Sequence, residues 1–114
     1  MAGKKTRGNR VRDQYEDFPY PHRDPKDEAR RLIAGSPGQL AEMNHYLFAG
    51  RRDFSKPFRV LVAGGGTGDA LIMLAQQLAG RGCPAEIHYL DLSSASRRIA
   101  EKRARVRGLD TIAF

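Results

Sequence analysis

Cysteine is almost absent from this 114-residue sequence, in which Cys83 is the only one. An internal disulfide and a zinc site built from cysteines are therefore excluded, and we expect no metal centre. No apolar stretch within an expected helix approaches the roughly 18 residues that a membrane-spanning helix needs, and no apolar signal segment follows the basic start of the chain. We therefore expect a soluble, cytoplasmic protein without a membrane partner.

Acidic residues are missing from residues 1–12, which carry five basic side chains and a single large apolar residue, Val11. Such a segment cannot bury enough apolar surface to offset the entropy lost on ordering, so we expect residues 1–14 to form a flexible basic tail. The other 102 residues hold 15 basic and 13 acidic side chains, which places most of the formal net charge of +7 in the tail. A solvated tail is the preferred interpretation, and nucleic-acid binding stays open as the alternative.

Residues 15–57 are expected to form an N-terminal arm followed by two short helices. The segment Tyr15–Pro25 contains three prolines and three aromatic residues, a composition that forbids a regular helix and suits an arm lying over a surface. In Asp27–Ile33 the acids precede the bases, as suits a helix dipole, and Gln39–Phe48 has apolar residues at helical spacing.

Residues 58–114 alternate short apolar runs with amphipathic segments, a pattern typical of a parallel α/β sheet. The first run is apolar enough to suit a strand buried on both faces. The fold class expected is α/β, a partial Rossmann-like parallel sheet of about three strands preceded by the two short helices and the basic tail. The strands are expected at Phe58–Ala63, Glu86–Leu92 and Thr111–Phe114, and the helices at Asp69–Ala79 and Ser93–Val106.

A glycine-rich turn joins the first expected strand to the first expected helix of this domain. Its residues are Gly64, Gly65, Gly66, Thr67 and Gly68, followed by Asp69. Asp91 stands 23 positions after Gly68, at the end of the second strand, and is followed by Leu92. Glycines allow a ligand to approach the start of the helix closely, and a carboxylate at the position of Asp91 can accept hydrogen bonds from both ribose hydroxyls. A helix N-cap is the alternative interpretation of Asp91.

Spacing separates three kinds of nucleotide site. A dinucleotide motif G-x-G-x-x-G needs glycine or alanine at position 69 or 71, where the chain has Asp69 and Leu71. A P-loop needs a lysine after the glycines, and no lysine occurs between Lys56 and Lys102. NAD and ATP are therefore disfavoured, and the pattern G-x-G-x-G remains.

This pattern resembles the first motif of the class I S-adenosylmethionine-dependent methyltransferases of bacterial type, over Val60–Asp91 and more loosely to Phe114. The resemblance implies S-adenosylmethionine as cofactor, an unknown methyl acceptor as substrate, and a cofactor site made by Gly64–Gly68, Asp69, Asp91 and Leu92. It further implies a sheet of seven strands, so we expect residues 58–114 to be a truncated methyltransferase domain and the chain to be an N-terminal fragment. Catalytic and adenine-binding residues would then lie beyond Phe114. Val62 departs from the family, which often has an acid two positions before the first glycine.

The negative charge of Asp69 gives a reason for the same cofactor that does not depend on the resemblance. A carboxylate beside the loop would repel a pyrophosphate but would suit a ligand that carries an ammonium and a sulfonium group. The alternatives of a nucleotide or dinucleotide enzyme and of a basic nucleic-acid-binding module stay open. The module would use residues 1–12 and the second helix, whose basic side chains we expect to be mostly solvated: Arg97, Arg98, Lys102, Arg103, Arg105 and Arg107.

Overall fold

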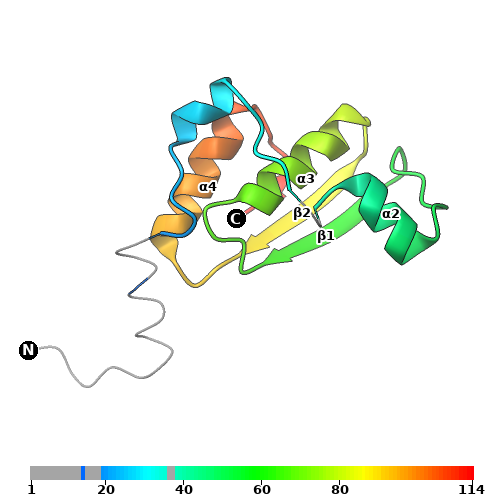
Figure 1. Ribbon diagram of the computed structural model, residues 1–114, viewed down its shortest axis with the longest axis horizontal. Helices are drawn as coiled ribbons and strands as arrows, with labels where there is room; N and C mark the ends of the chain where they lie inside the picture. The colour runs from blue at the N-terminus through cyan, green and yellow to red at the C-terminus, as the bar shows by residue number, and fades with distance from the viewer. Residues whose placement is uncertain (1–13, 15–18, 36–37) are drawn as a thin grey trace, which may run out of the picture.

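The computed structural model describes residue 14 and residues 19–35 and 38–114, so the predicted tail lies almost wholly outside the described residues. The elements of the described chain alternate as expected for an α/β fold (Figure 1). In chain order they are η1 (Pro25–Ala29), α2 (Leu40–Phe48), β1 (Phe58–Ala63), α3 (Asp69–Gly80), β2 (Ala85–Leu90), α4 (Ser94–Val106) and β3 (Ile112–Ala113). None of these helices is long and apolar enough to cross a membrane.

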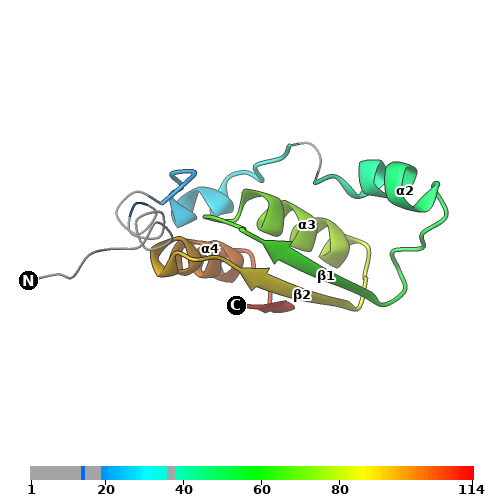
Figure 2. The ribbon, with the colours of Figure 1, turned by 90° about the horizontal axis from the view of Figure 1, so that it is seen from below.

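The three strands form one parallel sheet in the order β1-β2-β3. Strand β1 pairs with β2 along its whole length, from Phe58 opposite Ala85 to Ala63 opposite Leu90, and β2 pairs with β3 through Ile87 and Ile112. Helix α3 connects β1 to β2 and helix α4 connects β2 to β3, and both helices lie on the same side of the sheet (Figure 2). The predicted parallel α/β sheet of about three strands is confirmed.

Burial alternates along β1 and β2, because one face of the sheet carries no helix from the part of the chain that the structure describes. Ile87 and Tyr89 are buried against the helices, whereas Leu61 and Leu90 on the other face are 61% and 62% exposed. The prediction that Phe58–Ala63 is buried on both faces is therefore wrong for the described residues. An apolar composition alone does not distinguish a strand with two covered faces from a strand with one.

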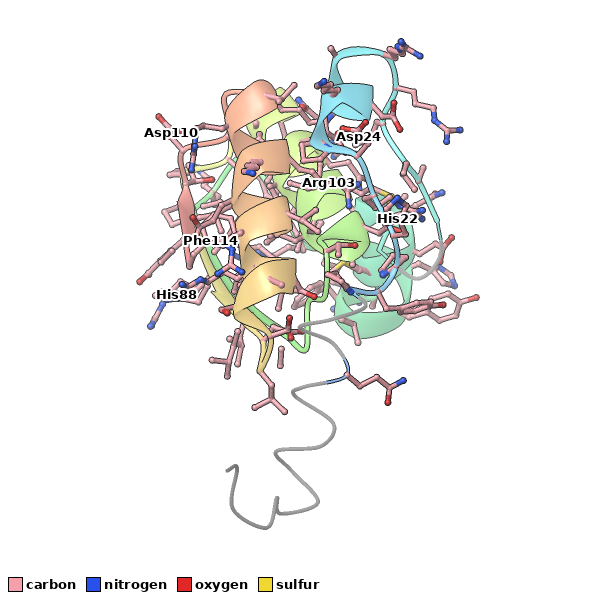
Figure 3. The ribbon with its side chains drawn as sticks, turned by 90° about the vertical axis from the view of Figure 1, so that its left-hand side faces the viewer. His22, Asp24, His88, Arg103, Asp110 and Phe114 are labelled. Atoms are coloured by element: carbon pink, nitrogen blue, oxygen red, sulfur yellow. The ribbon has the colours of Figure 1, made fainter. Side chains whose placement is uncertain are left out.

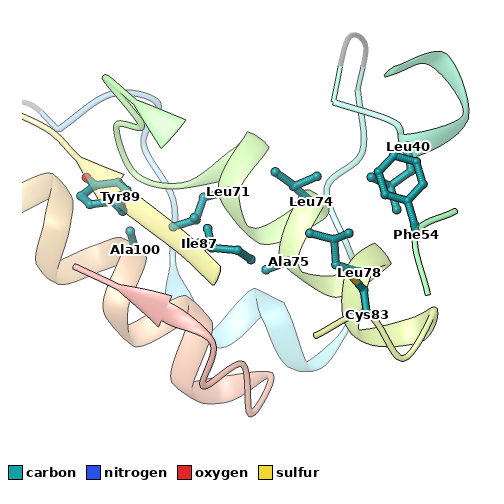
Figure 4. Close-up of a cluster of buried hydrophobic side chains, with 10 residues drawn as sticks. All are labelled: Leu40, Phe54, Leu71, Leu74, Ala75, Leu78, Cys83, Ile87, Tyr89 and Ala100. Atoms are coloured by element: carbon teal, nitrogen blue, oxygen red, sulfur yellow. The ribbon is translucent and has the colours of Figure 1, made fainter. Parts of the chain in front are cut away.

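The core lies between the sheet and α3, and extends toward α2 (Figure 4). Leu71, Leu74 and Leu78 recur at the spacing of one helical face and pack against Ile87 of β2. At the far end of the core, three phenylalanine rings meet edge to face, with ring centroids 5.2–6.3 Å apart. The buried cluster comprises Leu40, Phe54, Leu71, Leu74, Ala75, Leu78, Cys83, Ile87, Tyr89 and Ala100.

The N-terminal helices differ from the expectation more than the rest of the fold does. In place of a helix over Asp27–Ile33, the chain forms the five-residue 3-10 helix η1, which starts at Pro25 and is capped by the Asp24 carboxylate through the amide of Lys26. Helix α2 starts at Leu40, one residue later than predicted, and the side chain of Gln77 accepts a hydrogen bond from its first amide. Local capping by Asp24 sets the start of η1, and a contact with the distant Gln77 sets the start of α2. The periodicity of apolar residues reveals neither.

Residues 19–24, the strap, contain no helix or strand and lead from the glycine loop to η1. Helix η1 packs on α4 through Glu28, whose side chain is only 2% exposed and accepts from Arg103 at 2.7 Å and from Arg107. Arg103 lies between α4 and η1 (Figure 3) and is 1% exposed. The expectation that this side chain belongs to a solvated face of α4 is therefore wrong, because a buried carboxylate from a distant segment pairs with it.

Removing one partner of this buried ion pair should destabilise the fold strongly. In Arg103→Ala the Glu28 carboxylate stays buried without its main partner, and we expect a loss of about 3–5 kcal/mol, measured by denaturant unfolding followed by circular dichroism. Lys102→Ala, an exposed neighbour on the same helix, is the matched control and should stay within about 0.5 kcal/mol of the parent chain. Equal stability of the two variants would contradict the role given to Arg103.

Candidate functional site

The candidate site lies where β1 and β2 end side by side. Ala63 and Leu90 are the last paired residues of the two strands, and the amides of Gly64 and Gly65 both donate to the carbonyl oxygen of Leu90, at 2.7 and 3.2 Å. The carboxyl ends of parallel strands are the usual location of ligand sites in open α/β sheets. The glycine loop and Asp91 therefore start from neighbouring positions at this edge.

The backbone of the glycine loop takes a conformation that other residues rarely adopt. Gly64, Gly66 and Gly68 have positive φ angles of 65°, 57° and 107°, which explains the spacing of the motif G-x-G-x-G. Gly66 is restricted by space as well, since a Cβ atom there would lie 2.6 Å from the carbonyl oxygen of Tyr20 in the strap. The backbone of Gly64 and Gly66, without side chains, thus forms the floor of the site.

Asp91 lies against this loop, as the sequence predicts. Its Oδ2 accepts a hydrogen bond from the amide of Gly66 at 2.8 Å, and its Oδ1 accepts from the amide of Ser93 at 2.9 Å. The N-cap of α4 is Ser93 itself, whose hydroxyl accepts from the amide of Ser96, so Asp91 is not the cap of this helix. An ionised carboxylate has about four acceptor positions, and the described residues occupy two of those of Asp91.

A pocket of about 260 Å³ opens between the loop and Asp91. Small-molecule sites commonly measure roughly 300–1,000 Å³, so this pocket suits part of a cofactor rather than a whole one. Leu92, a predicted site residue, lines it and is 65% exposed. The full lining consists of Tyr20, Gly64, Gly66, Asp91, Leu92 and Ser96.

Two side chains hold the loop: Thr67, which the sequence predicts as a site residue but which does not line the pocket, and Tyr89, which sequence reasoning did not single out. Thr67 is fully buried, and its amide donates to the Tyr20 carbonyl at 3.3 Å while its hydroxyl donates to the Pro21 carbonyl. Tyr89 of β2 donates from its hydroxyl to the Gly66 carbonyl at 2.6 Å. Burial, and after it the nearby Asp91 carboxylate, raises the pKa of Tyr89, so this hydroxyl remains a donor.

The side chain of Asp69 does not line the pocket beside Asp91. Both of its carboxylate oxygens accept from Arg23 of the strap, at 2.8 and 2.7 Å, and Oδ1 also accepts from Arg103 at 2.9 Å. Partial burial acts to raise the pKa of Asp69, but the two arginines outweigh it and hold that pKa below its ordinary value. The hypothesis that Asp69 receives the positive charges of a ligand loses its support, because two guanidinium groups already neutralise this carboxylate.

The rest of the described surface offers no comparable site. A larger apolar groove of about 760 Å³ runs beside β1 and α2, but Glu42 is the one charged residue in its lining, so no set of polar groups converges there. In the described part of the chain, no group of three histidine, cysteine or acidic side chains is placed to hold a metal ion.

The basic side chains of α4 are less available to nucleic acid than the sequence suggests. Arg103 and Arg107 bind the buried Glu28, and Arg97 and Arg105 lie 3.4 and 3.9 Å from the carboxylate of Glu101. Internal pairing therefore reduces the positive field that this helix presents to solvent.

No protein-family model matches the chain, and the comparisons with curated proteins and with solved structures also give no match. Any functional argument therefore rests on the site itself.

Gly66→Ala should disturb the site by two mechanisms. The new Cβ would meet the Tyr20 carbonyl at 2.6 Å, and alanine would be held at a positive φ. We expect a destabilisation of at least about 1 kcal/mol together with shifted amide resonances in the strap, measured by unfolding and by NMR. Gly80→Ala is the matched control, because its Cβ would meet no atom within 4 Å and its φ is not positive. Normal strap resonances in Gly66→Ala would contradict the close contact.

Asp69 should contribute to the pH dependence of stability. Because its pKa is lowered in the folded state, its contribution is present above its unfolded value of about 4 and is lost as the pH falls through the lower folded value. Asp69→Asn should therefore be less stable than the parent chain at pH 7, and the difference should narrow below about pH 4. Thermal melts from pH 7 to pH 2 measure this. A constant difference over that interval would contradict the ion pairing of Asp69.

Proposed function

We propose that the chain binds S-adenosylmethionine at the glycine loop and supplies the cofactor-binding half of a methyltransferase whose methyl acceptor is unidentified. The observation that carries this proposal is the 2.8 Å hydrogen bond from the Gly66 amide to Asp91, which fixes a carboxylate beside a glycine loop whose one side chain, that of Thr67, is buried. Carboxylate and glycine loop are the two parts that the motif requires for an adenosyl ligand.

The residues at the pocket fit the sugar end of such a ligand. Asp91 lines the pocket, and its carboxylate can accept hydrogen bonds from both ribose hydroxyls. The exposed side chain of Leu92 offers apolar surface to the base. In this proposal Gly64, Gly66, Asp91 and Leu92 contact the cofactor, and the buried Thr67 and Gly68 shape the loop. Asp69 acts indirectly, by holding the strap through Arg23.

A dinucleotide ligand fits the same residues less well. Its motif requires a glycine or alanine at position 69 or 71 so that the helix can pack closely against the strand. Asp69 is held by Arg23 and Arg103, and Leu71 is a fully buried core residue of α3. Spacing and packing therefore disfavour a dinucleotide. The charge of Asp69 does not, because Arg23 and Arg103 neutralise it.

The chemistry proposed is a displacement at carbon. S-adenosylmethionine supplies an electrophilic methyl group: the acceptor's lone pair forms the new bond to carbon, and the electrons of the broken carbon–sulfur bond remain on sulfur as a thioether. The task of this chain is to bind and orient the adenosyl end, since alignment of the two reacting centres provides most of what such a transfer needs. None of the 114 residues is proposed as a catalytic base.

Asp91→Ala tests this function directly. Hydrogen bonds to a charged acceptor are worth about 1.5–3 kcal/mol, so loss of the carboxylate should weaken binding of S-adenosylmethionine at least about tenfold in isothermal titration calorimetry. Asp110→Ala removes an exposed carboxylate beyond α4 and should bind as the parent chain does.

Thermal melts of both variants separate lost binding from lost folding. A parent chain without affinity for S-adenosylmethionine would contradict the proposal. If such a chain instead bound RNA with an affinity that falls steeply as the salt concentration rises, the nucleic-acid alternative would be favoured.

A further inference from the structure

Two large apolar side chains lie exposed at the mouth of the same small pocket. Tyr20 of the strap is 71% exposed and Leu92 is 65% exposed, and both line the pocket whose floor is the glycine loop and Asp91. Single exposed apolar residues are ordinary on protein surfaces, but two that flank one polar-floored pocket provide a place for a flat apolar group.

We propose that Tyr20 is a ligand-contacting residue, whose ring forms the outer wall of the pocket and packs on the base of the bound nucleoside. This inference rests on the proposed function and adds to it a residue far upstream of the glycine motif. The strap is then part of the binding site rather than a cover over a site that is complete without it.

The backbone of Tyr20 is anchored to the loop that it helps to complete. Its carbonyl oxygen accepts from the Thr67 amide and lies where a side chain on Gly66 would be, and the next carbonyl, of Pro21, accepts from the Thr67 hydroxyl. The main chain is thus fixed while the phenol ring stays exposed beside the pocket. A main chain held in place before binding loses little conformational freedom when a ligand arrives.

A second anchor three residues further along prevents the strap from lifting away. Arg23 binds both oxygens of Asp69, and Asp69 is bound in turn by the buried Arg103. Fork-to-fork pairs of this kind fix orientation as well as distance. The strap is therefore tied to the loop at Tyr20 and Pro21 and to the start of α3 at Arg23.

Packing of an aromatic ring on a base depends on the ring and not on its hydroxyl, which makes the contact testable. The probe is S-adenosylhomocysteine, which carries the same adenosyl group. We expect Tyr20→Ala to weaken its binding about tenfold in isothermal titration calorimetry and Tyr20→Phe to change it less than twofold. Tyr46→Ala removes an equally exposed tyrosine, on α2, and should leave affinity unchanged.

Fluorescence provides a second measurement that does not depend on the alanine variant. The chain contains no tryptophan, so Tyr20→Trp introduces a single tryptophan at the pocket, which can be excited selectively over the remaining tyrosines. Titration with S-adenosylhomocysteine should change its emission saturably, with the dissociation constant found by calorimetry, whereas Tyr46→Trp should give no saturable change.

The outcomes separate this inference from the proposed function. If the parent chain and Tyr20→Ala bind S-adenosylhomocysteine equally well, or if the emission of Tyr20→Trp does not respond to a ligand that calorimetry shows to bind, the role of Tyr20 is wrong and the proposed function stands. If the parent chain has no affinity for the adenosyl ligands, both are wrong. A loss in Tyr20→Phe as large as in Tyr20→Ala would also overturn the ring contact, in favour of a hydrogen bond from the hydroxyl.

Discussion

The hydrogen bond between the Gly66 amide and the Asp91 carboxylate is the contact on which the arrangement of the site depends. Parallel pairing of β1 with β2 brings the two strand ends together, but it does not by itself orient a side chain from one toward a loop from the other. The carboxylate does so by bridging the loop amide and the amide of Ser93 at the start of α4. The same hydrogen bonds therefore set both the conformation of the glycine loop and the position of the Asp91 carboxylate.

A chain of alternating charges supports that feature from the helix side. Arg103 is buried beside Glu28, reaches the Thr67 carbonyl at 2.9 Å, and shares Asp69 with Arg23. Burying such groups carries a large desolvation penalty, which only close pairing and several hydrogen bonds offset. The guanidinium group of Arg103 therefore joins α4 to the glycine loop directly and to the strap through Asp69. A change in any one of these three segments affects the other two.

The local pattern predicted the sheet, its order of strands and helices, and the contact between Asp91 and the glycine loop, because these follow from periodicity, turn chemistry and the edge that parallel strands share. It did not predict the roles of Glu28, Arg103 and Tyr20. Arg103 lies among four other basic residues of α4 that look alike in sequence, and only the packing of η1 decides which of them is buried. The same limit explains the error over β1, whose second face has no covering element among the described residues.

The central claim is that the loop and Asp91 together bind an adenosyl cofactor. The most direct measurement is the ¹H–¹⁵N NMR spectrum of the chain titrated with S-adenosylmethionine. The account predicts saturable shifts at the amides of Gly64–Gly68 and of Leu92 and Ser93, with small changes at Arg81 and Gly82, at the other end of α3. Unchanged amides in the loop, or shifts confined to the groove beside α2, would contradict it.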